Sequence, residues 1–209
     1  MEKRVMIVMS GRVRKMAVTM AILVFGFLPA SALAGLVPPI WSTGFEDGFP
    51  PEANATGSWS VINSPVSAYS GSFGADIDGP TGIDGDTLLL PISSVGYQDL
   101  GLEYWFKIRD GLEVGDQVLA QWTADGTNWE TLATYTNQIA SDWQLAIFDL
   151  PTSADDNPNL AFRLFANLAN VSDRMNFDDL ALSGTPIPEP ITLGLLALGA
   201  LIVARRRFR

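Results

Sequence analysis

Leu100 to Arg109 reads LGLEYWFKIR, and its side chains alternate strictly in character. Every second residue is apolar, whereas the residues between them include the charged Glu103, Lys107 and Arg109. A repeat of two with one apolar face is typical of an antiparallel strand that turns one face to the core and the other outward. The stretch therefore predicts a half-buried antiparallel β-strand that must pair with neighbours on at least one side.

Short apolar runs separated by Gly, Pro, Asn and Asp recur along the chain, and no run between them keeps a helical period of 3.6 residues. The pair Asp125-Gly126 stands between two such runs and is a strong hairpin signal. Besides 100–109, the segments expected as strands are 42–45, 58–62, 68–77, 87–92, 117–123, 128–135, 143–150, 160–165 and 175–182. About ten strands spaced by turns predict an all-β, two-sheet antiparallel sandwich.

The chain ends with Pro188-Glu189-Pro190, an uncharged run from Ile191 to Ala204 and the cluster Arg205-Arg206-Arg207. The run has 14 residues, whereas a bilayer core needs roughly 20 helical residues, so it spans only with help from its flanks or in a thinned bilayer. Its glycines and leucines suit a membrane helix, and the arginines would remain cytoplasmic by the positive-inside rule. The alternatives are a plain single-span tail anchor and a buried core helix.

These three parts in this order resemble the PEP-CTERM sorting signal of Gram-negative bacteria. The resemblance covers residues 186–209 and implies that an exosortase, a membrane-embedded protease, recognises the motif and cleaves near Pro188–Pro190. It also implies an inner-membrane intermediate and final placement at the cell surface or in an extracellular polymer matrix. The residues to which this role falls are Pro188, Glu189, Pro190, Arg205, Arg206 and Arg207. The tail then takes no part in the fold.

The beginning of the chain also carries an export pattern. A basic segment between Lys3 and Lys15 precedes an apolar stretch from Met16 to Leu28, and Ala32-Leu33-Ala34 forms a small-x-small cleavage site. This order is typical of a secretory signal peptide at 1–34, which implies passage through the Sec translocon and a mature start at Gly35. An uncleaved N-terminal anchor is the alternative.

The segment 35–185 is left as one domain, long enough for a single buried core. It contains four basic and 21 acidic residues, a formal charge of −17. Such a surface repels nucleic acid and anionic lipid, and it suits divalent cations, neutral polymers or basic partners. The chain has no cysteine, so no disulfide stabilises the exported domain.

Four short motifs in this domain resemble the MAM-like and concanavalin-like jelly-roll domains of secreted bacterial proteins. GFEDG at 44–48 opens the domain and NFDDLAL at 176–182 closes it, and DGTNW at 125–129 and the segment 142–151 lie between them. The resemblance implies a jelly roll of two antiparallel sheets and a tendency to bind a structural calcium ion.

The charge pattern gives the calcium hypothesis a physical basis of its own. The first and last strands of a jelly roll can lie side by side, which would bring Glu46 and Asp47 close to Asp178 and Asp179. Carboxylates gathered with few cations repel each other unless a cation joins them, and calcium binds six to eight oxygens. These four residues are the predicted calcium ligands; an acidic rim that is merely solvated is the alternative.

Trp105 and Arg163 are the residues expected to bind a glycan. Trp105 lies on the polar side of the 100–109 alternation, and Arg163 occupies the equivalent side of another strand. An outward Trp among hydrogen-bonding neighbours can stack on a sugar ring. The alternative is that a loop covers this outer face.

The composition leaves few routes to catalysis. The chain has no histidine and no cysteine, so a Ser-His-Asp triad and a cysteine nucleophile are excluded. A glycosidase pair of carboxylates such as Glu103 and Glu130 stays open, because two acids among so many carry little information. The sequence therefore predicts a non-enzymatic, exported surface or matrix protein, with an exopolysaccharide-binding module as the alternative and a polysaccharide hydrolase as a third hypothesis.

Overall fold

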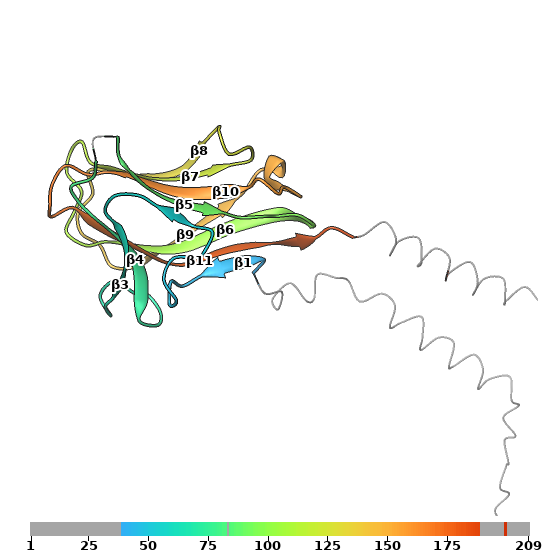
Figure 1. The fold of residues 1–209 in the computed structure, drawn as a ribbon, viewed down its shortest axis with the longest axis horizontal. Coiled ribbons are helices and arrows are strands. Elements are labelled where there is room, and N and C mark those ends of the chain that lie inside the picture. Colours follow the sequence, from blue (N-terminus) through green and yellow to red (C-terminus); the bar gives the residue numbers. More distant parts are fainter. Residues whose placement is uncertain (1–38, 83, 189–198, 200–209) are drawn as a thin grey trace, which may run out of the picture. The chain divides into compact units, whose positions relative to one another are not determined.

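The computed structural model describes residues 39–82, 84–188 and 199, and their regular structure is almost entirely β (Figure 1). Two antiparallel sheets lie face to face as two layers. This arrangement confirms the predicted two-sheet sandwich. The predicted signal peptide at 1–34 lies outside the described residues, and so does the sorting signal at 186–209 with its 191–204 helix, apart from residues 186–188 and Gly199. Within the described residues no helix is long and apolar enough to cross a membrane.

Sheet A has the order β3-β4-β11-β6-β9, with β1 pairing on part of β11. Its strands are β1 (Trp41–Thr43), β3 (Trp59–Asn63), β4 (Phe73–Asp78), β6 (Tyr97–Ile108), β9 (Gln144–Asp149) and β11 (Arg174–Pro186). Sheet B has the order β2-β5-β10-β7-β8. Its strands are β2 (Asn54–Ala55), β5 (Asp86–Pro91), β7 (Gln117–Thr123), β8 (Glu130–Tyr135) and β10 (Ala161–Asn167). A short 3-10 turn, η3 (Thr152–Ala154), follows β9.

The predicted alternation appears directly in the central strand β6. Leu100, Leu102, Tyr104, Phe106 and Ile108 are all buried between the sheets, and the residues between them are not. Apolar faces of the two sheets thereby remove each other from water, which is the main driving force for this fold. The core between the sheets contains a polar pair, the hydroxyls of Tyr104 and Tyr135, which hydrogen-bond to each other at 2.8 Å across the two sheets.

The hairpin predicted at Asp125-Gly126 connects β7 to β8, and it is longer than a two-residue turn because β8 begins only at Glu130. The strand predicted at 68–77 is wrong at its start, since β4 begins at Phe73. The preceding residues 64–72 form a loop that packs on the outer face of sheet A, where a Cβ on Gly74 would lie 2.0 Å from the Ser67 carbonyl oxygen. The local sequence of 68–77 does not reveal that its first half folds back over the sheet.

Candidate functional site

Trp105 lies on the outer face of sheet A, as predicted, and the covering loop reaches it. The ring of Tyr69 stacks on Trp105 with centroids 3.7 Å apart and planes 11° apart, and Trp143 meets Tyr69 edge-on at 5.9 Å. Tyr69 is 43% exposed, whereas Trp105 is half-buried. Since Tyr69 occupies one face of the indole, a sugar ring cannot stack on that face of Trp105.

Arg163 lies at the middle of the outer face of sheet B, on β10. Its Nε donates a hydrogen bond of 2.8 Å to Gln121 Oε1, and Gln121 Nε2 donates one of 2.9 Å to Thr131. The guanidinium carbon lies 4.1 Å above the ring centroid of Trp129 and 5.9 Å from that of Phe165. Burial lowers the pKa of Arg163 from its usual value, yet an arginine remains charged in any such setting. Together these contacts hold a cation in a fixed plane among half-buried aromatic rings.

Trp129 is placed beside Arg163 by the ordered β7–β8 loop. Asp125 accepts hydrogen bonds from the backbone N–H groups of Thr127 and Asn128 at 2.8 and 2.7 Å, and from the hydroxyl of Thr123 at 3.0 Å. These bonds, led by the Asn128 N–H, lower the pKa of Asp125, so it stays ionised and keeps the loop closed. The DGTNW motif at 125–129 thus supplies Trp129 to the site, and its other residues hold the loop that positions this ring.

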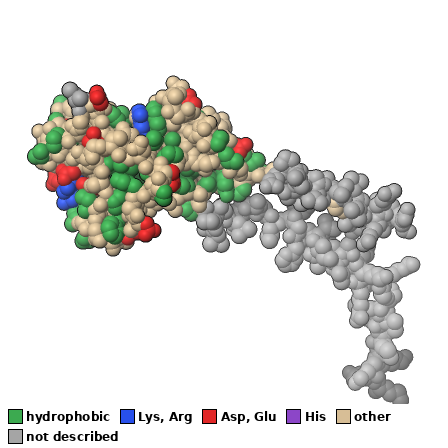
Figure 2. All heavy atoms as spheres, viewed as in Figure 1, with side chains coloured by type: hydrophobic (Ala, Val, Ile, Leu, Met, Phe, Trp, Pro, Cys, Tyr) green, Lys and Arg blue, Asp and Glu red, His purple; other side chains and the backbone are tan. Residues whose placement is uncertain are grey.

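The outer face of sheet B differs in charge from the rest of the domain. Register and burial identify its outward residues, which alternate with the core residues of each strand. Apart from Arg163 they are neutral: Asn54, Thr87, Leu89, Leu119, Gln121, Thr131, Thr134 and Phe165. In a domain of charge −17 this face carries no carboxylate at those positions and one arginine. Figure 2 shows, in one view, how few basic side chains the surface has among its acidic ones.

Two hollows of the surface lie away from this face. One, of about 600 Å³, is lined by residues 110–114 and 137–140, and the other, of about 530 Å³, by residues 41–52. Neither hollow is lined by Arg163 or its partners.

The structure does not bring the predicted glycan-binding residues together. Trp105 is on β6 of sheet A and Arg163 is on β10 of sheet B, and each faces outward from its own sheet. They therefore cannot serve one binding surface. The candidate acid pair is separated in the same way, because Glu103 lies on β6 and Glu130 on β8.

The first and last strands pair, as the calcium hypothesis assumed, with Trp41 opposite Leu182. Glu46 accepts hydrogen bonds from the backbone N–H groups of Ser72 and Phe73 at 2.8 and 3.0 Å. Its carboxylate occupies the space next to Gly71, where a Cβ would lie 2.1 Å from Oε1. Glu46 therefore anchors the end of the loop that covers sheet A.

Asp178 and Asp179 hold the middle of the same loop. The fully buried Asp178 accepts the N–H groups of Tyr69 and Ser70 at 2.7 and 3.1 Å, and Asp179 accepts the Ser70 hydroxyl at 3.0 Å. Burial raises the pKa of Asp178, and the hydrogen bonds from these N–H groups offset part of this rise. Asp47 is exposed in the adjoining turn. Within the described residues, Glu46, Asp47, Asp178 and Asp179 do not form a group of three carboxylates close enough to share a metal ion, and calcium ligation by these four residues stays a prediction.

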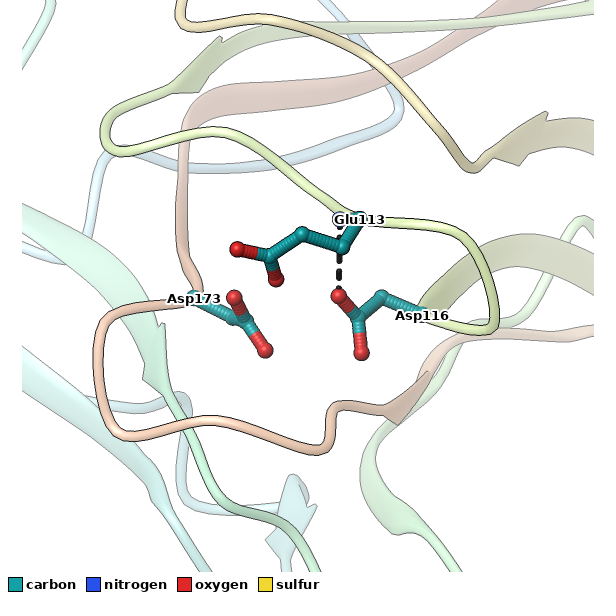
Figure 3. Close-up of side chains that lie close together, drawn as sticks. All are labelled: Glu113, Asp116 and Asp173. Carbon is teal, nitrogen blue, oxygen red and sulfur yellow. Dashed lines mark hydrogen bonds between the residues drawn. The ribbon is translucent and has the colours of Figure 1, made fainter.

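A second group of carboxylates meets at one end of the sandwich and was missed from the sequence (Figure 3). Glu113 and Asp116 come from the β6–β7 loop and Asp173 from the β10–β11 loop, with carboxylate oxygens within 4.8 Å of one another. Asp116 accepts the Glu113 and Ala169 N–H groups at 2.8 and 2.9 Å. Burial, followed by the nearby acids, raises the pKa of Asp173 to about 6, against the opposing effect of the Asn170 N–H. The two loops are far apart in the sequence: Asn170 donates a hydrogen bond to Glu113, 57 positions before it. The spacing of the acids in the sequence therefore gave no sign of this cluster.

Comparison with known proteins supports the architecture first. The sandwich is similar to TmCBM61, solved in complex with β-1,4-galactotriose, with a TM-score of 0.51, 13% identity, and coverage of 68% of this chain and 95% of that one. It is similar to the K2 cleaved adhesin domain of Lys-gingipain, with a TM-score of 0.52, 16% identity, and coverage of 68% and 98%. The K1 adhesin domain of Lys-gingipain from Porphyromonas gingivalis W83 gives a TM-score of 0.51, 15% identity, and coverage of 69% and 98%. At these identities the likeness concerns the fold.

The sorting motif is found independently of the fold. Residues 186–207 match the PEP-CTERM protein-sorting motif, so the predicted tail signal is confirmed as a motif. The motif indicates an exported protein that an exosortase recognises and that is held in the membrane before processing. No curated protein matches the chain. The MAM-like resemblance stays a prediction.

Proposed function

We propose that this chain is a surface or matrix protein of a Gram-negative bacterium whose β-sandwich binds a carbohydrate polymer on the outer face of sheet B. The observation that carries the proposal is the row formed by Arg163, Gln121 and Thr131, with Trp129 and Phe165 beside it. Aromatic rings supply apolar contact to the faces of sugar rings, and fixed amide, hydroxyl and guanidinium groups bond to sugar hydroxyls. Because these side chains already hold one another in place, ligand binding has little side-chain ordering to offset.

Export is the second part of the proposal. A signal peptide at 1–34 directs the chain to the Sec translocon, and an exosortase then cleaves near Pro188–Pro190 and removes the 191–204 helix with its arginines. The intact mass of the protein from the surface fraction of its host tests this. A mass running from Gly35 to the neighbourhood of Pro188, with or without an attached group, is expected. A mass that retains Ile191–Arg209 would mean a plain membrane anchor.

The fold similarity adds support for carbohydrate binding, because TmCBM61 was solved with β-1,4-galactotriose bound. The charge distribution of this chain fits the same role. The outward positions of sheet B carry no carboxylate although the domain is strongly acidic, so this face does not repel a neutral polymer.

Calcium is proposed as a structural ion near Glu46, Asp178 and Asp179. The raised pKa of the buried Asp178 marks a carboxylate whose charge a cation would stabilise. Calcium at about 100 times its dissociation constant would stabilise the fold by about 2.7 kcal/mol, which is a rise in Tm of roughly 5–11 °C for a domain of this size. Thermal melts in calcium and in a chelator measure it, and equal melting temperatures would exclude the ion.

Affinity electrophoresis of the full chain through gels containing neutral and acidic polysaccharides tests the binding site. The Trp129→Ala variant is expected to bind the retarding polymer at least tenfold more weakly, because the substitution removes the ring under Arg163. Trp105→Ala is the matched control, a half-buried outward Trp on the other sheet, and should retain binding. The reverse result would place the site on sheet A. Retardation by no polymer would favour a structural role, and release of reducing sugars would favour a hydrolase.

A further inference from the structure

We propose that the polymer bound at the Arg163 face is acidic, a polysaccharide containing uronic acid whose carboxylate pairs with Arg163. This inference rests on the proposed function, because it names the ligand class of the same face. It runs against the net charge of the domain, which by itself points to neutral polymers.

Arg163 differs from Arg174, whose guanidinium pairs with carboxylates of the described chain. Arg174 lies 3.3 Å from Asp76 and also pairs with Asp78, whereas no carboxylate among residues 39–82 and 84–188 pairs with Arg163. One of its five N–H groups donates to Gln121, and Trp129 supports the guanidinium plane. Within the same described ranges, no side chain or backbone group accepts a hydrogen bond from its two terminal nitrogens. A planar guanidinium held in this way presents a fork that matches the two oxygens of a carboxylate.

The strand positions next to Arg163 carry no charge, in contrast to the acidic domain as a whole. The neighbouring outward positions Leu89, Gln121 and Phe165 are uncharged. At about 0.15 M salt the screening length is about 8 Å, so only acids close to the guanidinium affect it strongly. An anionic group that reaches Arg163 therefore meets a guanidinium that forms no ion pair with a carboxylate of the described residues.

The surroundings of Arg163 favour a uronate over a simple anion. The buried Gln121 links Arg163 to the exposed Thr131 on β8, so that the Thr131 hydroxyl lies where it can face the hydroxyls of a sugar whose carboxylate lies on Arg163. Phe165 and Trp129 provide apolar surface beside the cation. A uronic acid combines a carboxylate, hydroxyls and an apolar ring face in one residue. It can therefore contact the guanidinium, the polar row and the aromatic rings at the same time.

Affinity electrophoresis of the full chain at about 0.15 M salt tests the inference with three probes. They are polygalacturonate, the same polymer with its carboxyl groups reduced, and dextran sulfate. Reduction of the carboxyl groups is expected to raise the dissociation constant at least tenfold, and so is Arg163→Gln on polygalacturonate. The matched control Lys107→Gln removes the same charge from sheet A and should change the dissociation constant less than twofold.

A second variant protects the test against misfolding. Gln121→Glu keeps the shape of the side chain and gives Arg163 an internal carboxylate at Nε. It should weaken polygalacturonate binding at least fivefold while the melting temperature is retained. Equal binding of the carboxyl-reduced polymer, with loss in Trp129→Ala, would overturn the acidic ligand and leave the proposed function standing. Equal binding of dextran sulfate would overturn the uronate, and retention of no polymer would overturn both.

Discussion

The hydroxyl pair in the core, Tyr104 and Tyr135, gives a prediction whose size follows from its burial. The two side chains are 0% and 6% exposed, and each hydroxyl is the other's partner at 2.8 Å. Tyr104→Phe alone leaves the Tyr135 hydroxyl buried without a partner, which costs about 1–3 kcal/mol. Tyr135→Phe alone should cost a similar amount for the same reason.

The double variant is the informative one. Replacing both hydroxyls removes both desolvated groups, so the double variant should lie within about 1 kcal/mol of the parent chain, whereas the singles sum to roughly 2–6 kcal/mol. Urea unfolding followed by tryptophan fluorescence measures all four free energies. Tyr69→Phe, at a 43% exposed tyrosine, controls for hydroxyl loss at the surface. A double variant that costs the sum of the singles would refute the pairing across the sheets.

Three further predictions concern the loop, the acidic cluster and pH. Gly71→Ala should destabilise by roughly 1–3 kcal/mol in urea unfolding, because φ is +62° and the new Cβ displaces the Glu46 carboxylate; Gly126→Ala, at φ +76° with open space around it, should cost about 1 kcal/mol. Asp173→Asn should stabilise the metal-free protein at pH 7 by roughly 1–3 kcal/mol, since it relieves a carboxylate whose pKa is raised; destabilisation in the presence of a chelator would contradict this. Burial raises the pKa of Tyr135 to about 12, so the folded state holds this proton more tightly than the unfolded one and stability should fall as the pH rises from about 10 to 12; a flat profile in alkaline melts would count against it.

The strands could be predicted because their signal is local. Leu100 to Arg109 alternates within one stretch of chain, and β6 follows that alternation residue by residue. The pairing of β1 with β11 also followed from the jelly-roll resemblance. The loop over sheet A could not be predicted, because Ala68 to Ile77 was expected to be one strand, and nothing local shows that its first part packs against Trp105 and Asp178.

The sequence predicted only part of the candidate site. Arg163 was singled out as an outward residue, and it is one. One partner depends on cross-strand register, which places Gln121 opposite Arg163 although they are 42 residues apart. The other depends on the loop that sets the ring of Trp129 against the guanidinium. The placement of Arg163 and Trp105 on different sheets could not be predicted, because the sequence does not say which strands share a sheet.

The most direct test of carbohydrate binding on sheet B is an NMR titration of the six tryptophan indole N–H signals of the full chain with polygalacturonate oligomers. The account predicts that the Trp129 signal moves with added ligand, while the signals of Trp105 and Trp143 at the outer face of sheet A stay in place. Movement of Trp105 and Trp143 with Trp129 unchanged would contradict it.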